Sequence, residues 1–227
     1  MVSANHAPPD SSAARVPRGR LNRKSVVEAA FALADAQGVE ALTMRSIAGH
    51  LGSKPMSLYR HVADKEDLLD ALVERVYSEF DSPDPAGPHW RAQLRRRASS
   101  VRRVLLRHPW ALTLIETRTG PDRPIALAHA EAVLATLVGA GASPRLAARA
   151  FVVLDAFIYG FALQQITMAV TDPAAVDTDS SDMPAQYPTM AQVAGSVASS
   201  PDYDFGAEFD PGLEVVLDGI ERWIGQQ

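Results

Sequence analysis

The apolar residues of this chain recur at the spacing of amphipathic helices. Between Asn22 and Gln37 they return every three to four positions, and Gly38 follows as a helix stop. Thr43 stands where it can cap a short second helix, which Gly52 ends. Pro55 then opens a third helix at the first-turn position, where its missing N–H is not needed. The first third of the chain therefore predicts three short helices in sequence.

The same periodicity continues to the end of the chain. A fourth helix is predicted over residues 64–81, followed by a proline-rich break up to Pro88, where we expect a domain boundary. Further helices are predicted from Trp90 to His108, where Pro109 ends the helix, and then over 124–137, 144–168, 189–197 and 211–224. No period-two alternation and no internal repeat is visible, so the fold class is predicted as all-α.

Composition agrees with a soluble globular chain. Apolar residues make up 47% and charged residues 22%. The chain has no cysteine, which excludes disulfides, thiolate metal sites and a cysteine nucleophile. The N-terminal arginines precede no apolar signal segment, and no uninterrupted apolar run of about 18 residues occurs. We therefore expect a cytoplasmic protein that neither is secreted nor contacts a membrane.

Charge is divided unevenly along the chain. The net charge is -5, yet up to Lys65 nine lysines and arginines face five acids, a surplus of four positive charges. The remainder has 13 basic and 22 acidic residues, a deficit of nine. An N-terminal region that is basic in an acidic protein is typical of a region that meets a polyanion.

The segment 43–62 has the helix, glycine turn and helix of a DNA-reading motif. Ala48 is small enough for the two helices to cross closely, and Gly52 tolerates the positive φ of the turn. The apolar positions predict that Ser57, Arg60 and His61 stay exposed, as donors and acceptors suited to bases and phosphates.

The run Leu58-Tyr59-Arg60-His61-Val62, followed by Asp64-Lys65 and Leu68-Leu69, resembles the recognition helix and connecting helix of the tetracycline-repressor (TetR) family. The resemblance implies a DNA-binding transcriptional regulator, in the family's usual mode a repressor released from its operator by a small molecule, and acting as a homodimer. It also implies phosphate or base contacts for part of the motif. The predicted DNA-binding residues are Thr43, Arg45, Lys54, Pro55, Met56, Ser57, Tyr59, Arg60, His61 and Lys65.

Three alternatives stay open in this region. Tyr59 has apolar neighbours and would also suit a core aromatic, and His61 would also suit a capping or solvent-exposed histidine. The arm over residues 1–21 carries Arg15, Arg18 and Arg20, which either form a solubility tail or grip DNA. The predicted domains are this flexible arm, a helix-turn-helix domain over 22–66, and a ligand-binding and dimerisation domain over 67–227.

A weaker resemblance to the ligand-binding half of tetracycline repressors covers residues 90–224. It rests on His108-Pro109-Trp110, the stretch 160–164 and a closing helix over 209–219. The sequence departs from tetracycline repressors at Arg97 and Val101, where they carry Asn and Phe, and near Ile115, where they carry a magnesium-binding His. A tetracycline–magnesium ligand is therefore not expected. No metal-ligand spacing occurs among the six histidines, so we predict no metal and no cofactor.

The dense arginine run between Arg91 and Arg107 predicts a solvated face that pairs with acids, while an inward Arg97 would suit an anionic ligand. His129 and Glu131 in an alanine-rich helix suit either satisfied polar positions or ligand contacts. A cavity with few polar groups suits a hydrophobic or aromatic ligand. The predicted ligand-binding residues are Arg97, Leu105, Trp110, Ile115, His129, Val133, Phe157 and Phe161.

The helix over 144–168 is apolar on two neighbouring stripes, which requires cover from its own domain and from a second body. A partner subunit is the simplest cover, with the last helix completing a four-helix interface. The predicted dimer residues are Val153, Phe157, Gly160, Gln164, Leu217, Ile220 and Trp223.

Two other function classes compete with the regulator. No GxSxG, GxGxxG, P-loop or paired-carboxylate pattern is present, so an enzyme has little support and the chain is predicted not to be one. A helical regulator that acts through a protein partner instead of a ligand is the remaining alternative. It would not need Arg60 and Lys65 gathered at one end of the chain.

Overall fold

A computed structural model describes residues 21–118, 124–170, 186–198 and 203–226 of the chain. All regular elements of these ranges are helices, which confirms the predicted all-α class. The arm arginines Arg15, Arg18 and Arg20 lie outside the described residues, and so does the segment from Thr171 to Pro184. The chain forms two compact units, which divide between Leu72 and Val73.

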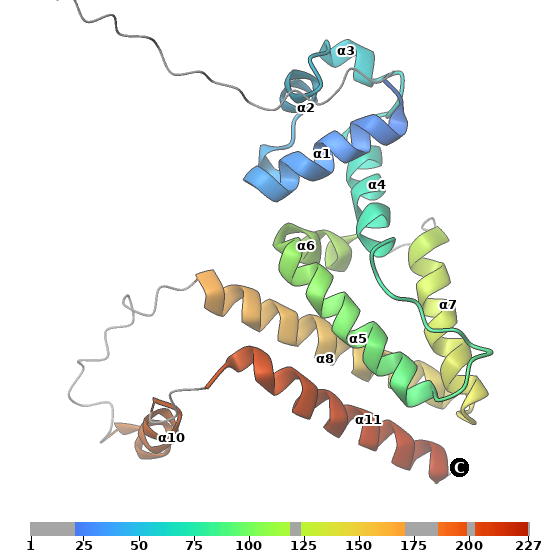
Figure 1. The fold of residues 1–227 in the computed structure, drawn as a ribbon, viewed down its shortest axis with the longest axis vertical. Helices are drawn as coiled ribbons and strands as arrows, with labels where there is room; N and C mark the ends of the chain where they lie inside the picture. The colour runs from blue at the N-terminus through green and yellow to red at the C-terminus, as the bar shows by residue number, and fades with distance from the viewer. Residues whose placement is uncertain (1–20, 119–123, 171–185, 199–202, 227) are drawn as a thin grey trace, which may run out of the picture. The chain divides into compact units, whose positions relative to one another are not determined.

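The N-terminal unit contains three helices and the start of a fourth (Figure 1). Buried apolar residues form its core, among them Phe31, Leu42, Ile47, Leu58 and Leu68. The elements are α1 (Arg23–Gln37), η1 (Val39–Ala41), α2 (Met44–His50), α3 (Pro55–Leu58) and α4 (Lys65–Tyr77).

Both α1 and α2 begin where the sequence predicts, and the reason is a capping box at each start. The Asn22 side chain accepts the Ser25 amide at 2.9 Å, and the Ser25 hydroxyl bonds back to the Asn22 backbone. Thr43 and Ser46 repeat this exchange at the start of α2, at 3.0 Å in both directions. Each box satisfies amides that a helix start leaves unpaired. Gly38 ends α1 with φ +83°, a conformation that other residues rarely adopt.

The C-terminal unit is built around one long helix. α5, α6, α7 and α11 all pack against α8, and α11 runs beside it (Figure 1). Salt bridges from Arg91 to Glu214 and Glu221, and from Arg107 to Glu79, confirm the predicted pairing of the arginine face with acids. The elements are α5 (Trp90–Arg107), α6 (Pro109–Thr117), α7 (Pro124–Gly139), α8 (Pro144–Val170), α10 (Pro188–Ala198), η3 (Phe205–Glu208) and α11 (Phe209–Gly225).

One helix was missing from the sequence-based prediction. Pro109 ends α5 as expected, but it also occupies the first turn of α6, which the prediction left without an element. His108 adopts φ -125° and ψ 67°, so the chain changes direction there and starts again. Proline thus terminates one helix and begins the next, because its fixed φ suits a helix start.

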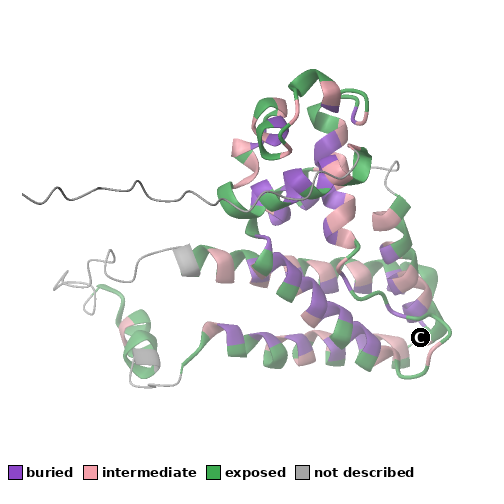
Figure 2. Ribbon diagram, turned by 45° about the horizontal axis from the view of Figure 1, so that its top comes forward, coloured by how far each residue is buried: buried purple, intermediate pink, exposed green. Residues whose placement is uncertain are grey.

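α8 keeps a large apolar surface outside the core of its own unit. Val152 is 64% exposed and Leu163 49% exposed, while Leu154 and Ile158 on the other side are fully buried. Figure 2 shows exposed positions along the length of this helix. By length and composition alone, α8 is the one described helix that could cross a membrane, a test that core helices of soluble proteins also pass. Its surface therefore needs an explanation beyond folding of the single chain.

Candidate nucleic-acid interface and ligand site

The connection between α2 and α3 has the geometry of a helix-turn-helix. Gly52 has φ +61°, and the Ser53 amide donates to the Ala48 carbonyl at 2.8 Å, which closes the turn. Lys54 is extended, as the residue before a proline prefers, and Pro55 starts α3. Ala48 is 1% exposed where the helices meet. These features fix the direction in which α3 presents its side chains.

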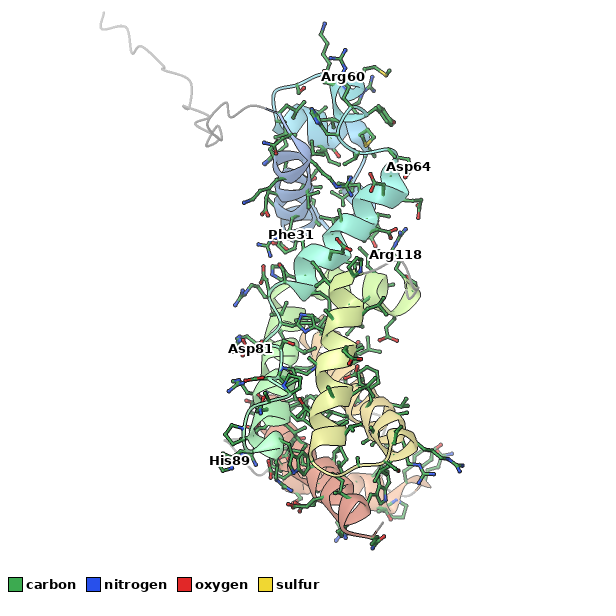
Figure 3. The ribbon with its side chains drawn as sticks, turned by 90° about the vertical axis from the view of Figure 1, so that its right-hand side faces the viewer. Phe31, Arg60, Asp64, Asp81, His89 and Arg118 are labelled. Carbon is green, nitrogen blue, oxygen red and sulfur yellow. The ribbon has the colours of Figure 1, made fainter. Side chains whose placement is uncertain are left out.

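The surface of this motif is rich in exposed hydrogen-bonding and cationic side chains. Tyr59 is 46% exposed, so it is not a core aromatic, and Met56 is 75% exposed. Arg60, labelled in Figure 3, is also exposed. Ser57 and His61 are half-buried. The exposed members of the predicted set are Thr43, Arg45, Lys54, Pro55, Met56, Tyr59, Arg60 and Lys65.

Thr43 already has a structural role in the isolated chain. Its hydroxyl oxygen accepts the Ser46 amide, and its own amide donates to the Ser46 hydroxyl. The Ser46 hydroxyl also donates to the Ala41 carbonyl at 3.0 Å. Any phosphate contact by Thr43 would therefore be made by a side chain that also holds the start of α2.

An ion pair that sequence reasoning missed lies beside the end of the recognition segment. Arg23 donates to both carboxylate oxygens of Asp67, at 2.7 and 2.6 Å, and to the His61 carbonyl at 3.3 Å. Asp67 also accepts the Ala63 amide at 2.8 Å. The hydrogen bonds from Arg23, assisted by this amide, lower the pKa of Asp67 against the opposing effect of desolvation. Arg23 thus links the start of α1, the end of the recognition segment and the start of α4.

In the C-terminal unit, the predicted inward arginine is present. Arg97 is only 3% exposed, and its Nη1 donates to Asp155 of α8 at 2.8 Å. Asp155 was missed, although a signal existed: it is the one acidic residue in α8, an otherwise apolar helix with basic and polar ends. A lone acid inside an apolar helix indicates a buried partner of opposite charge.

Tyrosine and histidine side chains surround this ion pair. The hydroxyls of Tyr77 and Tyr159 are hydrogen-bonded to each other, and both tyrosine pKa values are raised, chiefly by burial. His129 is 8% exposed and packs against Tyr77, with ring centroids 5.7 Å apart. Burial first, and then the Arg97 charge, lower the pKa of His129. Sequence reasoning also missed the two tyrosines, because an aromatic residue at an apolar position of a helix is usually a core residue.

The other predicted ligand residues fall into three places. Leu105, Ile115 and Val133 are buried in the interior of the unit. Phe157 and Phe161 instead contact Phe209, at centroid distances of 5.4 and 5.2 Å, in an aromatic cluster between α8 and α11. Trp110 is half-buried, with its ring 6.2 Å from that of His108. In the described part of the chain, no group of three metal-ligating side chains occurs.

Some of the predicted dimer residues are exposed, and others are buried in their own unit. Val153 is 38% exposed, Gln164 is exposed, and a side chain at Gly160 would meet no atom within 4 Å. Leu217 and Ile220 are 0% and 1% exposed, so they belong to the core of their own unit. Trp223 lines an open pocket of about 330 Å³ with Arg149 above its ring at 5.7 Å.

Taken together, a small unit whose helix-turn-helix exposes cationic side chains and a larger helical unit with a buried polar cluster indicate a DNA-binding regulator with a sensing domain. Comparison with known proteins agrees. Residues 26–72 match the model of the bacterial regulatory proteins of the tetR family, and residues 82–224 match the tetracyclin repressor-like C-terminal domain. The chain therefore belongs to the TetR family of transcriptional regulators, which are not enzymes.

Three relatives illustrate the similarity. The HTH-type transcriptional repressor DrrR1 of Streptomyces coeruleorubidus is 34% identical, over 94% of this chain and 82% of that protein. The tetracycline repressor protein class D of Escherichia coli is 35% identical, over 89% and 90%. Among solved structures, the TetR family protein ActR of Streptomyces coelicolor, in complex with actinorhodin, has a TM-score of 0.73 and 26% identity, over 91% of this chain and all of that one.

Proposed function

We propose that this chain is a homodimeric repressor that binds a specific operator and leaves it when an aromatic or largely apolar small molecule binds in the C-terminal unit. The observation that carries the proposal is the exposed surface of the helix-turn-helix. Lys54, Tyr59 and Arg60 extend from a segment whose backbone is fixed by the Gly52 turn, Pro55 and the Arg23–Asp67 ion pair.

Each part of this surface has a distinct role in DNA binding. Arg60 and Ser57 read base edges in the major groove, where guanidinium and hydroxyl groups distinguish base pairs. Lys65, Arg45, Tyr59 and His61 contact phosphates, which position the protein without reading sequence. Lys65 lies in the first turn of α4, where helix amides and the lysine charge both attract a phosphate.

The uncovered face of α8 supports the homodimer. Val152, Val153 and Leu163 expose apolar surface on a helix whose opposite side is core, and Gly160 would allow close approach of a second helix. A second copy of the chain offers the same face and can therefore cover it symmetrically. Val153→Glu should produce monomers in light scattering, whereas Leu127→Glu, at an exposed site on α7, should leave dimers. A dimeric Val153→Glu protein would contradict this interface.

Effector release is proposed from the relatives and from the sensing unit together. The E. coli relative is named for tetracycline, and ActR has been solved with actinorhodin. Release follows by linkage: a ligand that favours the arrangement unsuited to DNA weakens operator binding by the factor by which DNA weakens ligand binding. α4 contributes residues to both units, so a change at Tyr77 reaches Lys65 along one helix.

Sequencing of genomic DNA fragments that bind the purified protein tests the proposal. We expect one enriched motif with two-fold symmetry, whose half-sites lie about one DNA turn, roughly 34 Å, or somewhat more apart. The recovered motif would then serve as the operator in gel-shift measurements. Recovery of random fragments at low salt, with no motif enriched, would contradict sequence-specific binding.

A further inference from the structure

Two polar atoms inside the C-terminal unit have no hydrogen-bond partner in the described part of the chain. They are the Nε of Arg97 and the Nδ1 of His129, on side chains that are 3% and 8% exposed. Buried polar groups in native proteins are nearly always hydrogen-bonded, so each such atom calls for an explanation. A ligand that supplies the missing partners is one explanation that can be tested.

Arg97 presents a donor. Its Nη1 is held by Asp155 at 2.8 Å, which fixes the plane of the guanidinium and balances its charge. The Nε–H of the same planar group remains available, and a guanidinium has no acceptor to offer. The partner it lacks is therefore an oxygen, either a carbonyl or a phenolate.

His129 presents an acceptor. Burial lowers the pKa of its imidazole, so the ring is neutral at pH 7 and carries one proton. The ring is hydrogen-bonded to the Tyr77 backbone carbonyl, and Nδ1 has no partner, so the proton in that bond is on Nε2. Nδ1 then has a free lone pair. The partner that it lacks is a hydroxyl or another donor.

The surroundings of the His129 ring are aromatic. The Phe80 and Tyr77 rings lie 6.0 and 5.7 Å from the His129 ring, centroid to centroid, and pack on each other at 5.1 Å. The Arg97 charge lowers the pKa of His129, which places the two groups in one electrostatic environment. Aromatic side chains of this kind pack favourably on a flat ring system.

We propose that Arg97 and His129 form a donor and acceptor pair that recognises a hydroxyquinone, an aromatic ligand with both a carbonyl and a hydroxyl. Arg97 Nε–H donates to the ligand carbonyl, and the ligand hydroxyl donates to His129 Nδ1. This inference deepens the proposed function, on which it rests, because it names the ligand class of the effector site. It predicts selectivity for the hydroxyl, which a purely apolar cavity would not provide.

Calorimetry with two hydroxyanthraquinones and their methyl ethers tests the pair. Danthron has its hydroxyls beside one carbonyl, and anthraflavic acid has them away from it. Each is compared with its dimethyl ether, which keeps the rings and carbonyls but cannot donate. At least one hydroxyl compound should bind the full-length protein about ten-fold or more tightly than its ether. Equal affinity within both pairs, or no binding at all, would overturn the proposal.

Variants then assign the effect to the two residues. His129→Phe keeps an aromatic ring but has no acceptor, so it should abolish the preference for the hydroxyl. Arg97→Gln combined with Asp155→Asn removes the guanidinium donor without stranding a charge. The affinity for hydroxyl compounds and for ethers should then fall by about ten-fold alike. Arg96→Gln, an exposed neighbour on α5, is the matched control and should change nothing.

Operator binding without any compound shows whether each variant is folded, and it separates the two proposals. Folded variants that keep the hydroxyl preference of the natural chain would overturn the donor and acceptor pair while leaving DNA recognition intact. A natural chain that prefers the hydroxyl compounds but selects no DNA motif would instead contradict the proposed function and leave the pair standing.

Discussion

The two units of this protein treat their polar side chains in opposite ways. In the N-terminal unit, the capping and ion-pairing groups are satisfied within the unit, as in the Arg23–Asp67 pair and the Thr43 cap, and proposed DNA-contacting donors such as Arg60 are exposed. In the C-terminal unit, Arg97 and His129 are buried, and each keeps one unpaired atom. Exposed donors suit a large polyanion that arrives from outside, whereas buried unpaired atoms suit a small molecule that enters.

This contrast has an energetic consequence. An exposed ion pair contributes little to stability because water competes with it. Removal of one partner leaves the other charge hydrated. Removal of one partner from a buried pair leaves a charge without water or counter-charge. Equivalent substitutions in the two units should therefore have very different effects on folding.

The largest effect is expected at the buried pair. Asp155→Ala strands the Arg97 guanidinium, which is 3% exposed, and should lower the free energy of unfolding by about 3 kcal/mol. Urea denaturation measures the change. The control is Glu221→Ala. Glu221 is 61% exposed and pairs with Arg91, so its loss should lower the free energy of unfolding by under about 1 kcal/mol. Similar losses in both variants would remove the contrast between buried and exposed pairs.

Arg60→Ala should come next, with an effect on DNA recognition and not on folding. Loss of one base-reading side chain weakens operator binding by about 1 to 3 kcal/mol, and it should relax the preference at one base position. Gel shifts with operator and random duplexes measure both. Arg145→Ala, an exposed arginine of the C-terminal unit, is the control. An equal loss of affinity for operator and random DNA would mean that Arg60 contacts only phosphate.

Lys65→Ala, in contrast to Arg60→Ala, should weaken DNA binding without changing the sequence preference. A phosphate contact contributes equally on every duplex, so specific and random DNA should weaken together. The slope of log affinity against log salt should become shallower by about one, because one fewer counterion is released. Titrations at several salt concentrations give this slope. An unchanged slope would remove Lys65 from the phosphate contacts.

The smallest effect concerns Asp67. Its folded-state pKa is depressed below the ordinary 3.8, so the Arg23 pair stabilises the fold above that pH and is lost as the pH falls through the lowered value. Asp67→Asn should therefore cost about 1 kcal/mol of unfolding free energy at pH 7 and progressively less below pH 3.8. Denaturation of both proteins at several pH values checks this. Asp35→Asn, an exposed carboxylate on α1, is the control, and a pH-independent cost would contradict the pairing.

Sequence alone predicted much of the fold because its signals are local. Asn22, Thr43 and Pro55 mark helix starts through hydrogen bonds and φ values that involve only near neighbours in the chain. α6 was not predicted, because Pro109 was interpreted only as the end of α5, whereas it also starts α6. The exposed surface of the recognition motif followed from the same periodicity, although Ser57 and His61 are half-buried.

The buried cluster and the Arg23–Asp67 pair were missed because both depend on contacts between distant segments of the chain. Arg97 meets Asp155 across 58 positions of the chain, and Arg23 meets Asp67 across 44. No local pattern pairs such residues, and Tyr77 and Tyr159 look like core aromatics in any helical stripe. Burial of Leu217 and Ile220 likewise reflects the packing of α11 on α8, which a single helix pattern does not specify.

The most direct test of the account is a linkage measurement on one protein preparation. Operator affinity is determined with and without saturating danthron, anthraflavic acid or actinorhodin, and compound affinity is determined with and without operator. The account predicts that at least one compound weakens operator binding by roughly 5-fold to 150-fold, and that operator weakens that compound by the same factor. A compound that binds tightly in the C-terminal unit yet leaves operator affinity unchanged would contradict the claim that this protein is a ligand-released repressor.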